Sequence, residues 1–522
     1  MKRKYTYHVN KKIKEREIKY IPFRYILAMF LVVIEILSIM AIVILCAMYI
    51  PYFYLAILIT DIAVVISIIA SNDNPDYKVP WLLFVIVLPI VGFMLYFLFY
   101  KRKISKKTAK KIEDNKNSYA YDDDLAFAKL EQENKLAFSQ AKNLCKIDDT
   151  HLYQNSKINY YVNDNKMLQA ILEELKKAKK FIFLEFFIIE EGFFWDSILE
   201  VLKEKAQEGI DVKLVYDDIG CMMTLPGNYD KQLKKYKIST VQFSRLKGQA
   251  DGEFNNRSHR KILVIDGRVG FTGGVNLADE YINRTIKFGH WKDSMVRIEG
   301  EAVNELTKLF LLDYYINDKK SHQIVFENYF VYDNDKKEEK GYLIPFGDGP
   351  KPIYDFNVSK TMIMNMLYQA TSYVYITTPY LIVDNELMKA IENAALRNID
   401  VRIIVPHIPD KRLVFEMTKV SYRTLIKAGV KIYEYTPGFI HAKTYISDDS
   451  VGIIGTINLD YRSLTHHFEN GVWIYKDPVI LDIKQDLIES MNNSLFMNEI
   501  EFKDNILFKL IRSIVRIFSP LL

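Results

Sequence analysis

The chain carries one short polar pattern twice, and this repetition constrains the fold more than any other feature. Each copy reads H-x-K-x(4)-D and continues after six residues into G-[GT]-x-N. With only nine histidines in 522 residues, two matched copies are not expected by chance. The copies are His259-Arg260-Lys261 with Asp266 and Asn276, and His441-Ala442-Lys443 with Asp448 and Asn458. The sequence therefore predicts an internal duplication.

The residues before each motif repeat a second pattern, in which helical periodicity alternates with short apolar runs typical of buried strands. These segments are 166–180, 181–189, 198–208 and 212–216 in the first copy, and 361–372, 373–377, 386–397 and 401–405 in the second. Strands that alternate with helices predict an α/β layered fold. We expect two homologous α/β sandwich halves, 151–330 and 331–500, packed about a pseudo-twofold axis that brings the two motifs together.

Three long apolar stretches precede these halves, at residues 25–50, 52–70 and 81–100. A membrane-spanning helix needs about 20 apolar residues, and each stretch approaches or exceeds that length. We therefore predict a membrane region at 25–102 with two or three hydrophobic helices. Pro89 and Gly92 lie near the centre of the third stretch and favour a kinked or re-entrant segment there.

The charged segments around the membrane region leave its sidedness open. The tail 1–24 and the cluster 101–111 are both basic, and basic flanks favour the cytoplasm. Three full spans cannot satisfy both. We expect 103–150 to be a linker or a surface-lying helical segment. We expect 501–522 to be a basic amphipathic helix on an anionic leaflet, although a terminal helix packed on the core has the same pattern.

Strand alternation predicts which motif side chains point the same way. On a strand, residues two apart share a face, so His259 is expected beside Lys261, and His441 beside Lys443. The glycines that follow permit close backbone approach, so that Asn276 and Asn458 can reach the same pocket. Both halves together would supply two imidazoles, two ammonium groups and two amides.

That set of groups suits a phosphodiester. Lysines and amides can bind the non-bridging oxygens, whose charge grows in the transition state. One imidazole can attack phosphorus, while the other protonates the leaving oxygen and then activates the incoming hydroxyl. Asp266 and Asp448 join the candidate catalytic set, with the expected role of orienting and holding structure around the site. Glu280 and Glu469 are candidates to fix the tautomer of an imidazole.

The sequence favours neither a metal nor another cofactor. The motifs lack the clustered His, Cys or carboxylate ligands that zinc prefers, and Lys261 and Lys443 would repel a cation. The three cysteines form no disulfide or zinc pattern. The adjacent pair His466-His467 cannot point both rings the same way on a strand, so we interpret it as structural or as pocket lining.

These residues resemble the phospholipase D superfamily, with its paired H-x-K-x(4)-D motifs, and within it the bacterial cardiolipin synthases. The resemblance covers residues ~22–522. Beside the paired motifs, it is carried by the apolar segment 81–96 and by the phrases NRSHRK (256–261), FTGG (271–274), WKD (291–293), TPY (378–380), GFIHAK (438–443), NLDYRS (458–463) and SPLL (519–522). Thr456 departs from the serine that is common there, but it keeps a hydroxyl.

The resemblance implies a multi-pass protein of a bacterial cell membrane that joins two phosphatidylglycerol molecules into cardiolipin and releases glycerol. His259 would then be the nucleophile that forms a phosphatidyl-histidine. His441 would protonate the departing glycerol and deprotonate the acceptor hydroxyl. The near-symmetry of the halves allows the reverse assignment.

Two other functions remain open from the sequence. If water attacks the intermediate, the protein is a membrane-bound phospholipase D-type hydrolase; the membrane segments and the lack of a basic, aromatic-interleaved groove argue against a nuclease and a nucleic-acid partner. A lipid-binding scaffold that keeps inherited motifs is the non-catalytic alternative. Intact motifs in both halves argue against it.

Overall fold

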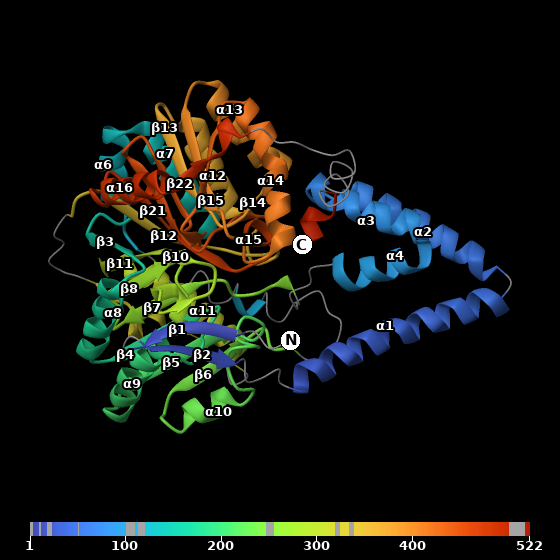
Figure 1. Ribbon diagram of the computed structural model, residues 1–522, viewed down its shortest axis with the longest axis horizontal. Coiled ribbons are helices and arrows are strands. Elements are labelled where there is room, and N and C mark those ends of the chain that lie inside the picture. The colour runs from blue at the N-terminus through green and yellow to red at the C-terminus, as the bar shows by residue number, and fades with distance from the viewer. Residues whose placement is uncertain are drawn as a thin grey trace.

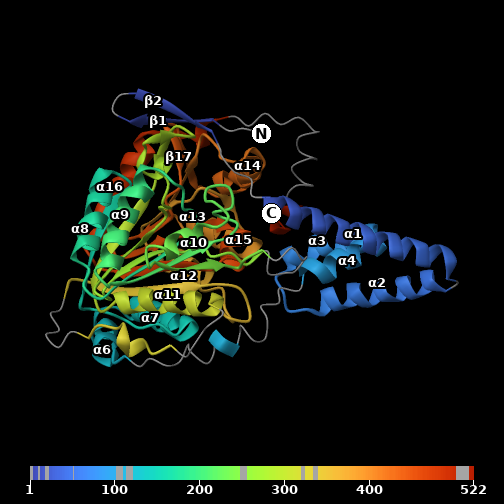
Figure 2. The same cartoon turned by 90° about the horizontal axis from the view of Figure 1, so that it is seen from below.

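The computed structural model describes residues 4–9, 12–17, 23–50, 52–100, 110–112, 121–246, 255–318, 324–332, 339–500 and 517–521. Two α/β halves are stacked on one another, and a helical arm projects from one side of this body (Figures 1 and 2). The arm contains the N-terminal apolar helices. The C-terminal residues lie near its base (Figure 1).

Each half is built on one mixed sheet, and the two sheets have the same strand order. The first is ordered β3-β11-β8-β7-β4-β5-β6, and the second β12-β21-β19-β18-β13-β15-β16 with β22 added at its edge. The first sheet consists of β3 (Ser156–Val162), β4 (Phe181–Phe186), β5 (Asp211–Asp217), β6 (Ser239–Phe243), β7 (Lys261–Ile265), β8 (Val269–Gly273) and β11 (Ser294–Gly300). The second consists of β12 (Tyr342–Asp348), β13 (Tyr373–Thr377), β15 (Asp400–Pro406), β16 (Lys431–Tyr435), β18 (Thr444–Ser447), β19 (Val451–Gly455), β21 (Glu469–Tyr475) and β22 (Ser494–Phe496).

The matching strand orders confirm the predicted duplication and the two α/β halves. In each sheet three strands are parallel, β4-β5-β6 and β13-β15-β16, because each is joined to the next by a helical crossover. Both motifs begin the central antiparallel strand beside this set, β7 or β18. The sheets are covered by helices α8 (Asn165–Lys177), α9 (Phe193–Gln207), α10 (Tyr229–Lys234), α11 (Val303–Asn317), α12 (Val358–Gln369), α13 (Asn385–Leu396), α14 (Arg412–Lys427) and α16 (Val479–Asn492).

One hydrophobic core runs through both halves. It joins Phe183 and Phe310 of the first half to Ile344 and Trp473 of the second in a single cluster of buried side chains. A short pair of strands also crosses the junction: β10 (His290–Lys292) of the first half pairs in parallel with β17 (Gly438–Ile440) of the second. The halves are therefore packed as one body, and this fixes the relative position of the two motifs.

The second part of the segment 103–150 is helical rather than a linker, and it contributes to the core instead of only lying on the surface. Residues 121–150 contain two helices, α6 (Asp124–Glu133) and α7 (Lys135–Asp148), which lie against the second half although they precede the first in sequence (Figure 1). Leu130, Ala141 and Leu144 are fully buried in the common core. The frequent charged residues concealed this apolar stripe, because they occupy the opposite helix face.

The N-terminal tail also forms structure. Strands β1 (Lys4–Val9) and β2 (Lys12–Glu17) make an antiparallel hairpin, and β1 pairs with β9 (Thr285–Ile286) of the first half. At the other end, the expected amphipathic helix 501–522 lies outside the described residues except for 517–521. Within that segment Ser519–Leu521 forms a single 3-10 turn that packs on the arm and on α15 (Tyr461–Thr465).

Within the described residues, two helices of the arm are candidates for membrane spans by length and composition. Helices α1 (Phe23–Tyr49) and α2 (Phe53–Ala70) each contain an 18-residue window apolar enough to cross a membrane. The third apolar stretch is broken at Leu88 into α3 (Pro75–Val87) and α4 (Pro89–Leu95), followed by a π-helical turn, Tyr96–Tyr100. A side chain at Gly92 would meet the Phe84 carbonyl oxygen at 2.1 Å, so this glycine permits α4 to fold back on α3. The predicted kink is confirmed.

The docking of α7 can be tested at Gln140, a buried residue that bridges two elements of the second half. Its Nε2 donates to Gln369 Oε1 at 2.6 Å, and its Oε1 accepts from Trp473 Nε1 at 3.0 Å. Gln140→Ala leaves both partners without this hydrogen bond, so we expect the free energy of unfolding to fall by about 2–4 kcal/mol. The matched change Gln485→Ala, at an exposed residue of α16, should shift it by less than about 0.5 kcal/mol. Equal midpoints for both variants in denaturant would show that α7 is not part of the folded core.

Candidate active site

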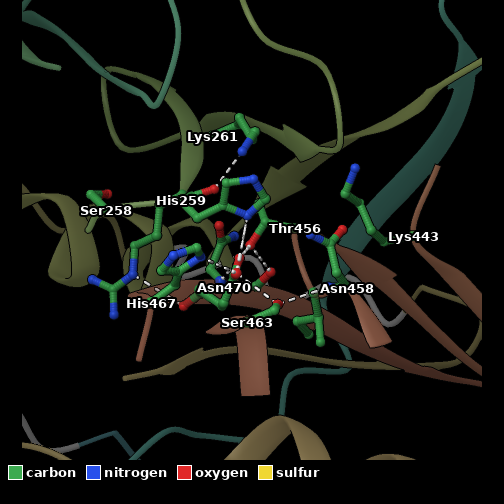
Figure 3. Close-up of polar contacts among 12 residues, drawn as sticks. Ser258, His259, Lys261, Lys443, Thr456, Asn458, Ser463, His467 and Asn470 are labelled. Atoms are coloured by element: carbon green, nitrogen blue, oxygen red, sulfur yellow. Dashed lines mark hydrogen bonds and ion pairs between the residues drawn. The ribbon is translucent and has the colours of Figure 1, made fainter. Parts of the chain in front are cut away.

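The first motif histidine is held by a carboxylate of the other half. His259 Nδ1 lies 2.9 Å from Glu469 Oε2 and 3.0 Å from Oε1. Glu469 begins β21 of the second half, and its side chain is completely buried. Since Nδ1 donates to the carboxylate, the lone pair of the neutral ring lies on Nε2. Figure 3 shows His259 among the polar side chains of both halves.

The second motif histidine has the reciprocal partner. His441 Nδ1 lies 2.7 Å from Asp293 Oδ2, and Asp293 precedes β11 of the first half. The backbone repeats this exchange, because His259 N donates to Phe468 O at 2.8 Å and His441 N to Lys292 O at 2.7 Å. Each half therefore completes the histidine site of the other, and neither site would be complete in a single half.

The second position of each G-[GT]-x-N pattern faces the carboxylate of its own half, and the residue there differs between the halves. Thr456 donates its hydroxyl to Glu469 Oε2, and Ser463 donates to Oε1 at 2.7 Å. At the equivalent position Gly274 leaves room for Asp293, because a Cβ there would meet Asp293 Oδ1 at 2.0 Å. The second G of the first G-G-x-N pattern is thus required by a close approach. The T of the second pattern supplies a hydrogen bond instead.

Two lysines lie beside the histidines, one at the start of β7 and one just before β18. Lys261 and Lys443 are fully buried, and each Nζ donates to the carbonyl oxygen of its own motif histidine, at 2.6 Å for Lys261. Burial lowers the pKa of Lys443 to about 8 and that of Lys261 well below its usual value, against the pull of Glu469 and Asp293. Lys443 also lowers the pKa of Lys261, and both lysines lower the pKa of His441. Positive charges therefore repel one another in the free site, and a bound anion would relieve this repulsion.

The same burial keeps both imidazoles neutral. Desolvation lowers the pKa of His259 to about 3, with a further decrease from Lys261. It lowers the pKa of His441 to about 4, again with Lys443 acting in the same direction. Glu469 and Asp293 stay ionised: although burial alone would raise their pKa values, the facing histidines and hydrogen-bond donors hold both below the usual range. A neutral imidazole with an oriented Nε2 is the form required of a nucleophile.

The comparisons with known proteins identify the family. The cardiolipin synthase, phospholipase D-like domain matches twice, at residues 171–311 and 363–493, and an N-terminal domain shared by phospholipase D and nucleases matches 59–99. The chain belongs to the cardiolipin synthase family of the phospholipase D superfamily. It is an enzyme of a family that transfers phosphatidyl groups.

Relatives match over almost their whole length. A cardiolipin synthase of Alkalihalophilus pseudofirmus is 33% identical over 471 residues, which are 88% of this chain and 91% of that protein. Cardiolipin synthase 2 of Staphylococcus epidermidis is 32% identical over 85% of this chain and 92% of that protein. The crystal structure of a phosphatidylserine synthase from Haemophilus influenzae covers 74% of this chain and 100% of that one at a TM-score of 0.56 and 17% identity, which shows a shared fold.

The cardiolipin synthase family motif includes two aspartates that lie away from the histidines. Asp266 and Asp448 end β7 and β18, five residues beyond Lys261 and Lys443, so a strand places them about 16 Å from the lysines. Asp448 accepts three backbone N–H groups at the start of β13, from Thr371, Ser372 and Tyr373, at 2.7–2.9 Å. Asp266 does the same for β4, with 179–181 as donors. These contacts agree with the expected role of holding structure around the site, and a catalytic role for either aspartate stays a prediction.

Glu280 was expected to orient an imidazole, and the structure excludes this. Its carboxylate pairs with Lys287 at 2.6 Å, and the position it was expected to fill belongs to Asp293. The sequence carried a usable signal, because Asp293 stands in the WKD phrase of the family. Spacing from the asparagine failed in the first half because the carboxylate that faces His441 stands further along the chain, just before β11. Glu469, the other candidate, does contact an imidazole, but it is the imidazole of the first motif.

The two asparagines differ in what they offer a phosphate. Asn276 Oδ1 accepts from Ile188 N at 3.0 Å and its Nδ2 donates to Tyr281 Oη at 2.8 Å, so the protein already uses both ends of this amide. Asn458 Oδ1 is buried with no hydrogen-bond partner. Figure 3 shows its side chain among the residues of the site. Phosphate binding by this pair stays a prediction; it would use the Nδ2 donors, because the unpaired Asn458 Oδ1 is an acceptor, as the phosphate oxygens are.

Arg260 occupies the variable position of the first H-x-K motif, and the sequence did not predict a role for it. Its guanidinium is buried between the halves and donates to Asp313 at 2.8 Å, to Tyr354 at 2.8 Å and to the backbone oxygen of Glu469 at 3.1 Å. It thus fixes the strand that carries the carboxylate partner of His259. The signal was its difference from Ala442 in the second motif, which shows that the two halves are not equivalent around the site.

Within the described residues, one group has the spacing of metal ligands: His259, His467 and Glu469. His467 Nδ1 lies 3.7 Å from Glu469 Oε1, and its ring centroid lies 5.6 Å from that of His259. Glu469 already accepts hydrogen bonds from His259, Ser463 and Thr456, and two lysines lie close by. This chemistry suits an anion better than a cation. His466 faces Tyr77 instead, with ring centroids 5.5 Å apart, so the adjacent histidines point to different neighbours.

The structural role of the motif aspartates gives a prediction. Asp448→Asn keeps a side chain that tolerates the left-handed φ of 55° but replaces one acceptor oxygen by an amide donor. We expect the free energy of unfolding to fall by about 1–3 kcal/mol while kcat per folded molecule stays within about twofold. Thermal unfolding and steady-state kinetics on the same preparation measure both. A large loss of kcat in fully folded protein would place Asp448 in catalysis after all.

Proposed function

We propose that this protein is a membrane-bound cardiolipin synthase that moves a phosphatidyl group from one phosphatidylglycerol to a second, giving cardiolipin and glycerol. The proposal rests on one observation above all: two neutral imidazoles, each oriented by a buried carboxylate of the opposite half, share a site with two buried lysines. The family relationship supports the same activity, since the named relatives are cardiolipin synthases.

In the first proposed step, His259 Nε2 attacks the phosphorus of the donor lipid. A phosphorus–nitrogen bond forms, and the bond from phosphorus to the headgroup glycerol oxygen breaks. His441 supplies the proton to that oxygen, so glycerol leaves as a neutral alcohol. Both imidazoles are neutral in the free site, but the bound phosphodiester anion stabilises a protonated His441 and raises its pKa.

In the second proposed step, the acceptor hydroxyl attacks the phosphatidyl-histidine. His441, now neutral, takes the hydroxyl proton while the new phosphorus–oxygen bond forms and His259 leaves. Glu469 stabilises the positive ring of His259 while the intermediate exists, since its ionised carboxylate faces Nδ1. Lys261 and Lys443 bind the non-bridging oxygens through both steps. Water at the acceptor position would give phosphatidic acid instead.

The arm suits substrates that stay in the bilayer. Each acyl chain removed from the membrane would cost about 0.8 kcal/mol per CH₂, so an enzyme anchored there meets its lipids without extracting them. Two spans, α1 and α2, would return the chain to the side on which it began. This arrangement would put the basic segments 1–24 and 101–111 on one side, as their charge favours, which three spans would not. We propose a multi-pass protein of the cell membrane with its catalytic body on the cytoplasmic side.

The reaction is tested with purified full-length protein, phosphorus-labelled phosphatidylglycerol and a chelator of divalent ions. We expect cardiolipin and free glycerol from the wild type, and losses of at least about 10³-fold in His259→Ala and His441→Ala. His407→Ala is the matched control, because His407 also pairs with a carboxylate, Glu434 at 2.7 Å, but lies outside the site. Phosphatidic acid as the only product would show a hydrolase. Labelled protein from His259→Ala, with none from His441→Ala, would reverse the roles of the histidines.

The alkaline limb of the pH profile should report Lys443. Its pKa of about 8 in the free site means that its charge is lost above that pH, so kcat/KM should fall there as the anionic lipid binds less well. Lys443→Arg keeps the charge at all accessible pH values, so the midpoint of the limb should move upward even where the rate is lower. A limb at the same pH in this variant would assign it to another group.

A further inference from the structure

The first turn of α3 docks the membrane arm onto the second half through a compact set of polar contacts, here called the α3 clamp (Asn74, Asp76 and Tyr77). Asn74 Nδ2 donates to Asp384 Oδ2 at 2.8 Å. Asp76 Oδ2 accepts from Asn385 N at 2.9 Å and from Tyr461 Oη at 3.0 Å. Beside these contacts a cavity of about 630 Å³ separates α3 from α13 and α14, so side-chain packing there is incomplete. The clamp therefore carries much of the docking.

Tyr77 bonds both ends of a single short helix. Its hydroxyl donates to the backbone oxygen of Tyr461, the first residue of α15, at 3.2 Å and also contacts the hydroxyl of Thr465, the last. Its ring packs edge-on against Tyr461 with centroids 5.5 Å apart. A five-residue helix is too short to be stable by its own hydrogen bonds, so α15 depends on such tertiary contacts for its position.

The opposite side of α15 reaches the catalytic carboxylate. Ser463, in the middle of this helix, donates to Glu469 Oε1 at 2.7 Å and accepts from the backbone N of Asn458 at 2.8 Å. Glu469 in turn orients His259. A continuous series of hydrogen bonds and one rigid helical turn thus joins the membrane arm to the expected nucleophile.

The C-terminal residues support the same helix from outside. The turn Ser519–Leu521 packs on both α3 and α15, and Phe518 lies against Phe84 of α3 with ring centroids 5.3 Å apart. Residues from the two ends of the chain therefore meet on α15. Simple anchoring would need neither end to touch an active-site helix.

We propose that the α3 clamp is a positioning element of the active site, and that Tyr77 is a positioning residue that sets Glu469 and His259 through α15 and Ser463. The inference rests on the proposed phosphatidyl transfer and adds to it that the membrane arm takes part in catalysis beside anchoring the enzyme. Loosening α15 leaves the substrate-binding lysines in place but lets Glu469 rotate away from Nδ1. The reaction slows because the imidazolium form of His259 loses its stabilising partner.

The test removes one hydroxyl from the full-length enzyme and uses short-chain, water-soluble phosphatidylglycerol, so that delivery of lipid from a bilayer is not required. We expect Tyr77→Phe to lower kcat about tenfold and to leave KM within about twofold, since one hydrogen bond that supports the transition state is lost. Thr465→Val, which removes the partner hydroxyl at similar volume, should reproduce this loss. Tyr100→Phe is the matched control, because the Tyr100 hydroxyl bonds Ser71 and Asp73 within the arm and should leave kcat unchanged.

A double-mutant comparison separates positioning from general stability. If Tyr77 acts through Ser463, then Tyr77→Phe combined with Ser463→Ala should be no slower than Ser463→Ala alone; independent effects would multiply and overturn the proposal. Full short-chain activity of Tyr77→Phe, with a loss only on vesicles, would also overturn it and assign Tyr77 to anchoring. Glycerol release is the readout throughout, because it is the same for transfer and hydrolysis. A wild type that releases no glycerol would contradict the proposed function itself, whereas a normal Tyr77→Phe contradicts only the role of the clamp.

Discussion

The exchange of carboxylate partners across the pseudo-twofold axis is the contact on which the site depends. His259 needs Glu469 of the second half, and His441 needs Asp293 of the first. These pairs orient both rings and keep the carboxylates ionised in a buried place, where an unpaired charge would be costly. The common core and the strand pair β10–β17 exist in the same interface and hold the exchange in register. A shift of one half against the other would break both pairs at once.

Burial gives the site its chemistry as well as its geometry. It lowers the pKa values of both histidines and both lysines, so a positive charge on any of these four groups is costly in the free site. A phosphodiester relieves this cost because its negative charge stabilises the cations. The same anion raises the pKa of the histidine that must act as an acid. Substrate binding can therefore create the protonation state that the first step needs.

The sequence was sufficient for the duplication, the α/β halves and the four central side chains, because the motif spacing and strand periodicity are local properties. It was insufficient wherever a contact crosses between halves. Glu280 was a candidate because it follows Asn276 in sequence, whereas the carboxylate that orients His441 is Asp293, which stands further along the same half. Asp266 and Asp448 were expected to hold structure around the site, but the sequence did not show which backbone groups they bind beyond β7, of five residues, and β18, of four. Residues 121–150 were expected to be a linker or a surface-lying helical segment because charged residues are frequent there, whereas a narrow apolar stripe packs them on the core.

By itself, the sequence determined that this chain has two homologous halves, apolar segments long enough for a membrane, and paired imidazoles and lysines suited to a phosphate. Only the tertiary structure decided which carboxylate serves which histidine, that the third apolar stretch folds back on itself, and that the arm reaches α15. The physical reason is range: periodicity and motif spacing record contacts among neighbours along the chain, whereas hydrogen bonds such as Glu469 to His259 form between residues about 200 positions apart and exist only once both halves have packed.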